Sequence, residues 1–527
     1  MSRLAGAGMV ALSALLYAAA FPPTSFPFLI WIGLAPLLAV LGRCRTARQA
    51  GAIGAVWALV MTLFVGRCLP PAVEIFHEQS LLAGWLLLAG AGLLTAVPQY
   101  ALFAVVFRAL AVRYRAGLPI LAGAAWAAAE WARVELPPGN PWAIAGLATV
   151  DMSELAGMAR VTGVYGLSFL VAATNTALVL LVGDALSSAG LHRNFPAPES
   201  KASRTTRRPA AIIAAIAATF LVAFALGRGS RPAKPEAAPR TIAIVQPALP
   251  PDRARAPDDH RRRLQNHLDL TAIAVEESQP DVVVWPESSL GFFLEQDGPW
   301  RNDLQLRAPL AGAELVAGGP RLLDSGGVAN SLFLLGPGQW PAATYDKQVL
   351  LPLGEWFPVN SSALLRRDLG AAPQTYATGI KNGLLPTTAG QMGPAICNEI
   401  MVPGILRAHI NNGAGLLLNP ANDAWFPHSG CPLGLFQIAR MRAIEHGRWL
   451  VRASSSGPSA IIDPSGQIVA QVPIGEPGWA GAAVPEVREK TFYSRWGDLF
   501  GAGSLLVVLL ALWRRPFPTV ERSNPYR

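Results

Sequence analysis

Long apolar stretches alternate with short polar segments over the first 230 residues of the chain. A helix that spans a bilayer needs about 20 mostly apolar residues, and each stretch approaches or exceeds that length. The predicted spans are 4–21, 26–42, 49–66, 80–107, 116–132, 161–183, 210–227 and, near the C-terminus, 497–513. The first span also resembles a secretory signal, but further spans follow it at once. We therefore expect a polytopic α-helical membrane domain of about eight spans.

Basic residues gather in every second loop between these spans. They are Arg43, Arg45 and Arg48, then Arg108, Arg113 and Arg115, then Arg193, Lys201, Arg204, Arg207 and Arg208, and finally Arg514 and Arg515. The alternate loops carry Glu74, Glu78, Glu135, Asp151 and Glu154 instead. Cytoplasmic loops are enriched in Lys and Arg. The pattern therefore predicts that both termini are cytoplasmic and that residues 228–496 lie outside.

The composition supports a membrane protein and excludes several other classes. Hydrophobic residues make up 52% of the 527 positions and charged residues only 15%, which excludes a disordered chain. The formal net charge is +9, but most basic residues flank apolar stretches and do not cover a soluble face, so nucleic-acid binding is not indicated. The four cysteines are too few and too scattered for a disulfide framework or a structural zinc site.

A Pro- and Ala-rich linker, Arg228–Arg240, separates the membrane region from a segment with the pattern of an α/β domain. Short, nearly continuous apolar runs in this segment predict central strands that are covered on both faces. The runs are Thr241–Gln246, Asp281–Trp285, Glu314–Ala317, Ser331–Leu335, Pro394–Cys397, Gly415–Leu418 and Ala460–Ile462. Asp258–Ser278 has the pattern of an amphipathic helix. The predicted domains are 1–230 (membrane), 231–488 (catalytic) and 489–527 (last span and tail).

Three residues with reactive or charged side chains follow predicted strands of this domain. Glu287 follows one apolar run, Cys397 ends another, and Lys347 lies just before a Gly-Glu-Trp-Phe-Pro segment. Ligands of open α/β sheets bind where the strands end, so the three side chains could form one site. The Glu would take the thiol proton, the Cys would attack a carbonyl carbon, and the Lys would stabilise the oxyanion. The segment contains neither a G-x-S-x-G elbow nor an H-E-x-x-H motif, which argues against an ordinary serine hydrolase or a zincin.

The sequence blocks around these residues resemble those of a known family. The blocks are Val284-Trp285-Pro286-Glu287-Ser288, Tyr345-Asp346-Lys347 with Gly354-Glu355, Ile396-Cys397-Asn398-Glu399, Asn422-Asp423-Ala424-Trp425-Phe426, and 437–445. They resemble the Glu-Lys-Cys signature of the nitrilase (carbon–nitrogen hydrolase) superfamily and its membrane-embedded branch, the apolipoprotein N-acyltransferases.

The resemblance implies an αββα sandwich that faces the periplasm from the bacterial inner (cytoplasmic) membrane. It also implies transfer of an acyl chain from a membrane phospholipid, through a thioester on Cys397, to the N-terminal amine of a diacylated apolipoprotein. Neither a metal nor an organic cofactor is expected.

Further residues receive expected roles around this triad. The resemblance assigns Glu355 to holding Lys347 charged, and the backbone amide near Asn398 is expected to share the oxyanion. Glu399 is expected either to orient the active site or to make a structural hydrogen bond. Candidate lipid-binding residues are Trp356, Phe357, Trp425, Phe426, Asn140 and Trp142, although core packing and an interfacial aromatic belt are alternative roles.

Some positions depart from the family pattern, and other functions stay open. Asn398 stands where Tyr is usual, and the segments 427–432 and 454–457 differ from the family's common sequences. These changes leave open a paralogue that acylates a different amine, a membrane-tethered amidase or nitrilase-type hydrolase, and a binding protein with a residual site. A bond between Cys431 and Cys397 would silence the nucleophile, so we expect Cys431 to be unpaired.

Overall fold

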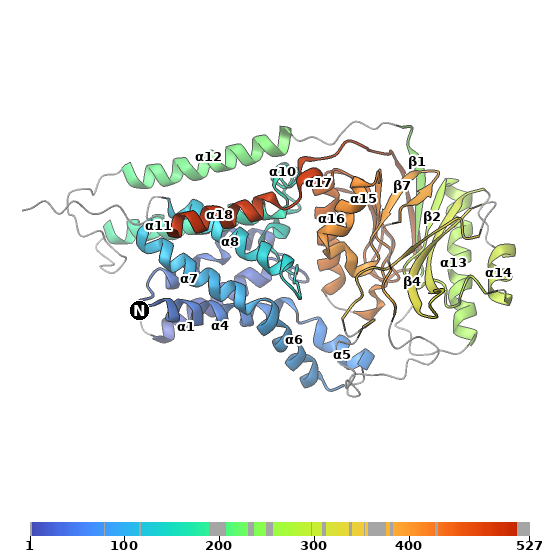
Figure 1. The fold of residues 1–527 in the computed structure, drawn as a ribbon, viewed down its shortest axis with the longest axis horizontal. Coiled ribbons are helices and arrows are strands. Elements are labelled where there is room, and N and C mark those ends of the chain that lie inside the picture. The colour runs from blue at the N-terminus through green and yellow to red at the C-terminus, as the bar shows by residue number, and fades with distance from the viewer. Residues whose placement is uncertain are drawn as a thin grey trace, which may run out of the picture.

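The structure is a computed structural model in which a helical membrane part and an α/β domain lie end to end (Figure 1). The described residues are 3–77, 79–114, 117–188, 207–229, 237–248, 257–296, 298–307, 312–336, 340–352, 354–356, 376–379, 383–426 and 430–513.

Helices occupy every segment in which the sequence predicts a span. They are α1 (Arg3–Ala19), η1 (Pro27–Leu29), α2 (Ile30–Gly33), α3 (Ala35–Leu41), α4 (Ala47–Val65), α5 (Leu69–His77), α6 (Leu81–Thr95), α7 (Val97–Arg113), α8 (Leu118–Glu135), η2 (Ala145–Thr149), α9 (Ser153–Ala156), α10 (Ala159–Thr162), α11 (Val164–Ser188), α12 (Arg207–Gly229) and α18 (Leu499–Trp513). The C-terminal helix α18 lies against α8, far from it in sequence (Figure 1).

Among the described residues, three helices are long and apolar enough to cross a membrane. They are 47–65, 164–186 and 209–229. A fourth span is possible if α6 and α7, which bend by 46° at their junction, cross as one broken unit. The shorter apolar helices 4–19, 27–41 and 499–513 lie in the remaining apolar segments. The chain thus has a helical membrane domain, in which length and composition identify fewer spans than the eight predicted.

The second part of the chain folds into two six-stranded sheets. The first has the order β12-β1-β2-β3-β4-β5 and the second β11-β10-β9-β8-β7-β6. The strands are β1 (Arg240–Gln246), β2 (Val282–Val284), β3 (Glu314–Leu322), β4 (Val328–Leu335), β5 (Ala343–Asp346), β6 (Leu385–Thr387), β7 (Gly390–Pro394), β8 (Leu416–Leu418), β9 (Leu450–Arg452), β10 (Ser459–Ile462), β11 (Ile468–Val472) and β12 (Gly478–Val484). In each sheet the three central strands that include β2 or β8 run parallel, with antiparallel strands outside them.

Helices cover the outer face of each sheet, which gives the expected αββα layers (Figure 1). The helices and short 3₁₀ turns of this domain are α13 (Pro257–Ser278), α14 (Pro299–Arg307), η5 (Cys397–Met401), α15 (Pro403–Asn411), η6 (Asp423–Trp425), α16 (Cys431–His446) and α17 (Phe492–Trp496). Ile244 and Val284 of one sheet and Leu416 and Val451 of the other belong to the buried cluster between the sheets. Burial on both faces explains why these strands are apolar at successive positions.

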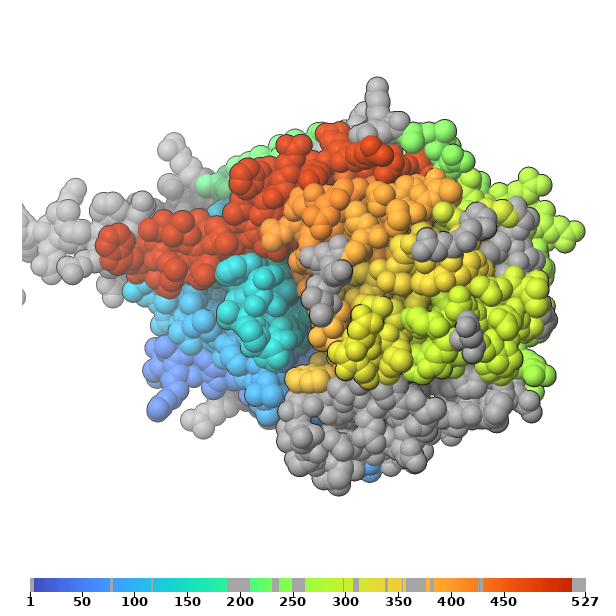
Figure 2. Space-filling model, turned by 45° about the vertical axis from the view of Figure 1, so that its right-hand side comes forward, coloured from blue at the N-terminus to red at the C-terminus, as the bar shows by residue number. Residues whose placement is uncertain are grey.

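The layer formed by α15 and α16 faces the membrane helices, and the two parts share one continuous apolar core. Figure 2 shows the orange and red parts of the chain against the cyan and blue helices. Glu445 of α16 accepts a hydrogen bond of 2.8 Å from the backbone N–H of Val164, the first residue of α11. Glu445 also forms a fully buried ion pair with Arg442. The α/β domain therefore packs directly against the membrane domain.

Candidate active site

The three predicted reactive residues lie at the ends of strands from both sheets. Glu287 comes three residues after β2, Lys347 directly follows β5, and Cys397 comes three residues after β7. All three are buried, with 6%, 1% and 7% of their surfaces exposed. The predicted strand that ended at Cys397 stops at Pro394, and Cys397 instead begins the 3₁₀ turn η5.

Lys347 is held between two carboxylates. Its Nζ lies 3.0 Å from Oε1 of Glu287 and 2.9 Å from Oε2 of Glu355. Burial alone would lower the pKa of the Lys347 ammonium group, but the two carboxylates outweigh it and raise the pKa above its ordinary value. A buried charge is tolerated only when it is paired and hydrogen-bonded, and here the pairing keeps the lysine cationic.

Asn330, a residue that the sequence reasoning missed, bridges the same two carboxylates. Its Nδ2 donates at 2.8 Å to Glu287 Oε1 and at 2.7 Å to Glu355 Oε1. It lies inside β4 and is 5% exposed. Asn330 therefore gives each of the two buried carboxylates a hydrogen-bond donor in addition to Lys347.

The second oxygen of Glu287 faces the opposite sheet. Oε2 accepts a hydrogen bond of 2.8 Å from the backbone N–H of Asn422, the residue before η6. Gly318 of β3 lies so close to the backbone of Glu287 that an added Cβ would come within 2.8 Å of its Cα. Hydrogen bonds to both oxygens and the close approach of Gly318 to the backbone therefore fix the position of the Glu287 carboxylate.

Cys397 adopts a left-handed backbone conformation with φ of 51°. Its N–H donates at 2.8 Å to the carbonyl oxygen of Pro420, and its carbonyl oxygen accepts from Asn419 Nδ2 at 3.2 Å. Such a conformation is strained for a residue with a side chain and persists only where its surroundings enforce it. Burial, and then the charge of Glu287, raise the pKa of the Cys397 thiol well above its ordinary value, while Lys347 acts in the opposite direction.

Glu399 connects the turn that carries Cys397 to the segment that follows Lys347. Its Oε1 accepts from the backbone N–H groups of Gln348 at 2.6 Å and Val349 at 3.0 Å. Its Oε2 accepts from Ile396 N–H at 2.7 Å and from the Tyr345 hydroxyl at 3.0 Å. Burial raises the pKa of Glu399 to about 7, against the opposing effects of Lys347 and these N–H groups.

Asn398, next to Glu399 in the same turn, makes a further contact with the segment that follows Lys347. It is 4% exposed, and its Nδ2 donates at 3.2 Å to the carbonyl oxygen of Val349. The Asn398 amide thus joins the turn of the cysteine to the segment that follows the lysine.

The unusual serine-rich segment 454–457 supports the turn whose N–H group holds Glu287. Ser455 Oγ donates at 2.8 Å to Asn422 Oδ1, and Ser454 Oγ donates at 2.6 Å to Asp423 Oδ2. Arg452 Nη2 forms a buried ion pair of 2.7 Å with the same Asp423 oxygen. Two serine hydroxyls and the Arg452 guanidinium therefore hold this turn.

The six candidate lipid-binding residues fall into different environments. Trp356 is 45% exposed next to Glu355, Phe426 is half-buried, and Phe357 and the side chain of Trp425 lie outside the described residues. Asn140 donates at 2.7 Å to Thr95 Oγ1, and Trp142 packs closely against Gly434 of α16. The described contacts of Asn140 and Trp142 thus lie within the membrane domain and at its boundary with α16, away from the triad.

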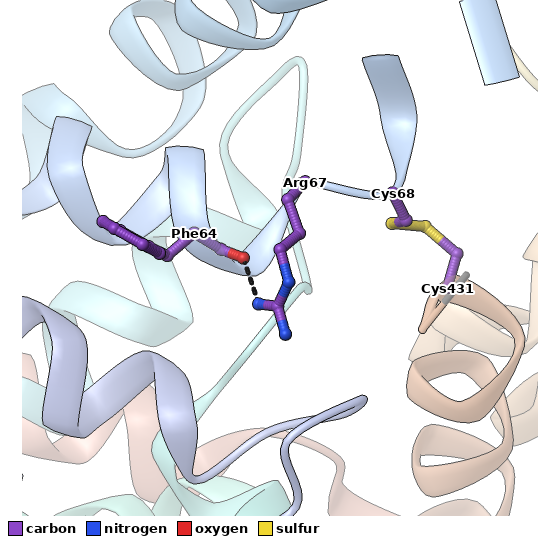
Figure 3. Close-up of a disulfide and its surroundings, with 4 residues drawn as sticks. All are labelled: Phe64, Arg67, Cys68 and Cys431. Atoms are coloured by element: carbon purple, nitrogen blue, oxygen red, sulfur yellow. Dashed lines mark hydrogen bonds between the residues drawn. A yellow bond between two sulfur atoms is a disulfide. The ribbon is translucent and has the colours of Figure 1, made fainter. Parts of the chain in front are cut away.

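The prediction that Cys431 is unpaired is wrong. Cys431 forms a disulfide with Cys68 of the membrane domain, whereas Cys397 and Cys44 are free (Figure 3). The sequence alone does not show how the two domains meet, so it does not identify Cys68 as the partner of Cys431. The disulfide leaves the thiol of Cys397 available for chemistry.

Comparisons with known families divide the chain at the same place as the fold does. The apolipoprotein N-acyltransferase N-terminal domain matches residues 13–177, and the carbon-nitrogen hydrolase family matches residues 241–490.

Full-length relatives and solved structures show further similarity. An apolipoprotein N-acyltransferase of Geobacter metallireducens is 28% identical over 518 residues, covering 96% of this chain and 95% of its own. One from Sinorhizobium medicae is 31% identical over 473 residues, covering 86% and 83%. A nitrilase-superfamily protein of Saccharomyces cerevisiae matches 48% of this chain and 92% of its own at 19% identity, with a TM-score of 0.38.

Proposed function

This chain belongs to the apolipoprotein N-acyltransferase family, and we propose that Glu287, Lys347 and Cys397 carry out the acyl transfer that gives the family its name. The chain is an enzyme of lipoprotein N-acylation. Its acceptor is a lipoprotein, in keeping with the names of its relatives, and we propose a membrane phospholipid as its acyl donor. The match of residues 13–177 to the N-terminal domain of these transferases distinguishes the chain from a carbon-nitrogen hydrolase that lacks this domain.

In the proposed first half-reaction, Glu287 removes the proton of the Cys397 thiol and the thiolate attacks an ester carbonyl of the phospholipid. Because the pKa of the thiol is raised, little thiolate is present at rest, and an adjacent base is needed to take the proton as the sulfur attacks. Lys347, which its two carboxylates keep cationic, stabilises the oxyanion together with the backbone amide near Asn398. The lysophospholipid then leaves, and the acyl chain remains as a thioester on Cys397.

In the second half-reaction, the free α-amine of a diacylglyceryl-cysteine attacks this thioester. Glu287, returned to its ionised form, accepts the amine proton, and the N-acylated lipoprotein is released. Glu355 positions Lys347 and Asn330 positions Glu287 throughout, because each is hydrogen-bonded directly to that side chain. Trp356, Phe426 and their neighbours Phe357 and Trp425 would shield the acyl chain from water. Asn140 and Trp142 would shape the lipid entrance.

We place the enzyme in the bacterial inner membrane with about eight spans and a periplasmic catalytic domain. The alternation of basic and acidic loops supports this orientation. The Cys68–Cys431 disulfide supports it independently, because disulfides persist in oxidising compartments such as the periplasm and are rare in the cytosol. A site next to the bilayer spares the cost of extracting lipid chains, about 0.8 kcal/mol for each CH₂ group.

The observation that carries this proposal is the buried cluster of Lys347, Glu287 and Glu355 beside a free Cys397, in a chain that aligns with these transferases along nearly its whole length. The test is genetic rescue of a bacterium depleted of its own N-acyltransferase. The wild-type chain should restore growth and N-acylated lipoproteins, and Cys397→Ala should not. Equal rescue by both, or full membrane expression without rescue, would overturn the assignment.

A further inference from the structure

The disulfide between Cys68 and Cys431 joins two parts of the chain that are 363 residues apart (Figure 3). Cys68 lies between α4 and α5 in the membrane domain, and Cys431 is the first residue of α16 in the catalytic domain. Their Cα atoms are 5.8 Å apart, within the ordinary range for a disulfide, and the residues are 8% and 5% exposed. The bond is therefore a covalent connection between the two domains.

The start of α16 is already packed against the membrane domain without this bond. Gly430 approaches Pro23 and Gly434 approaches the Trp142 ring so closely that neither position has room for a Cβ. The helices α5 and α6, by contrast, extend beyond the helical bundle alongside the catalytic domain (Figure 1). Cys68 directly precedes α5, so the bond fastens the α5–α6 arm to a domain interface that also includes Pro23, the loop at Trp142 and the start of α11.

The fastened segment leads directly to the proposed active site. Eight residues separate Cys431 from Asn422, whose N–H group donates the hydrogen bond of 2.8 Å to Glu287. The disulfide thus anchors a residue that is close in sequence to the one that orients the proposed base.

We propose that the Cys68–Cys431 bond is a redox-controlled fastening that fixes the α5–α6 arm to the start of α16 and keeps Asn422 in its working position beside Glu287. The effect of the bond on catalysis rests on the proposed acyl transfer and on the proposed periplasmic location of the domain. Formation of the bond converts two thiols and the disulfide of a periplasmic dithiol oxidant into the protein disulfide and a reduced dithiol. Reduction by a dithiol is the reverse exchange. Neither step consumes Cys397, which keeps its thiol in both states.

The first test determines whether the disulfide is present and does not require enzyme activity. Full-length protein is denatured without reductant, alkylated with a maleimide and analysed by peptide mass spectrometry. Cys44 and Cys397 should be labelled, and Cys68 and Cys431 only after reduction. Labelling of Cys68 and Cys431 without prior reduction would overturn the proposal, whatever reaction the chain catalyses.

The second test asks whether the bond matters for transfer. Wild-type enzyme in lipid nanodiscs is compared with and without a dithiol reductant, with rates measured for thioester formation and lipopeptide acylation. Reduction should slow acylation about tenfold, less than the roughly hundredfold that a 1 Å displacement of a catalytic group can cost.

The matched variants separate the bond from side effects of the reductant. The double variant Cys68→Ser, Cys431→Ser should be slow with or without reductant, whereas Cys44→Ser, which removes the other free cysteine, should behave like the wild type. An equal rate for oxidised and reduced wild-type enzyme would overturn the fastening role. If oxidised wild-type enzyme forms no thioester at all, the proposed function fails, and the alkylation result still decides the bond.

Discussion

Lys347 Nζ lies 3.0 Å from Glu287 Oε1, and both side chains are almost fully buried. The same nitrogen contacts Glu355, so one cation is paired with two acidic side chains in the interior of the domain. Removing one partner of a buried ion pair costs more than the pair contributes, because the remaining charge has neither water nor a counter-ion. The cluster therefore links the chemistry of the site to the stability of the fold.

Lys347→Met should abolish acyl transfer and also destabilise the catalytic domain by about 3–5 kcal/mol, because it leaves Glu287 and Glu355 buried without a counter-ion. Thermal unfolding in detergent, read from the domain's circular dichroism, measures this loss. Cys397→Ala is the matched control, since it removes the proposed nucleophile and leaves no charge behind. Equal stability of the two variants would contradict the account of the cluster.

Glu287→Gln should make the thiol of Cys397 react faster with iodoacetamide at pH 8, although transfer is lost. The negative charge of Glu287 raises the pKa of this thiol, so its removal lowers the pKa and increases the thiolate fraction. Alkylation rates between pH 7 and 10 provide the measurement. Glu276→Gln on the exposed surface of α13 should leave the profile unchanged. A slower reaction in Glu287→Gln than in the wild type would refute the electrostatic assignment.

Gly318→Ala should reduce transfer strongly and destabilise the domain by about 1–3 kcal/mol, the usual cost of an overpacked site. The new Cβ would meet the backbone of Glu287 and displace its carboxylate. Gly404→Ala in α15 is the control, because a Cβ there has no neighbour within 4 Å. The comparison uses initial rates of lipopeptide acylation, and similar losses in both variants would count against the close approach at Gly318.

Glu399 should give the stability of the domain a pH dependence that Glu399→Gln lacks. Its pKa is raised from 4.5 to about 7 in the folded protein, so the folded state binds the proton more tightly than the unfolded chain does. This contribution is complete below pH 4.5 and is lost as the pH rises to about 7. The unfolding free energy of the wild type, relative to the variant, should therefore fall between these values and stay constant above them. A difference that rises with pH would contradict the burial effect.

The sequence predicted the parts of the fold in which apolar residues run continuously. The strands β1, β2, β4 and β8 coincide with predicted runs, because central strands buried on both faces are apolar at every position. The strands β11 and β12 were missed, since β11 is largely exposed and β12 is rich in Gly and Ala. Their identity as strands depends on their pairing with β10 and β1, which no local pattern reveals.

Contacts between residues far apart in the sequence were likewise not predictable at the site. Glu287, Lys347 and Cys397 could be predicted because reactive side chains are unexpected at the ends of apolar runs. Asn330 could not, because it lies within a strand and contacts carboxylates 43 and 25 residues away in the sequence. The partner of Cys431 was missed for a related reason, since the pairing depends on how two separately predicted domains dock.

The fate of an acyl group on Cys397 tests the central claim most directly. Incubation with phospholipid alone should add one acyl mass to the intact protein, removable by neutral hydroxylamine and absent in Cys397→Ala. Because the proposed chain-binding residues are apolar and would exclude water, this acyl-enzyme should persist until a diacylated lipopeptide with a free N-terminal amine is added. The peptide should then be N-acylated rapidly, and an N-acetylated peptide should have no effect. Decay of the acyl-enzyme to free fatty acid at one rate, with or without the free amine, would contradict the account and identify a lipid hydrolase.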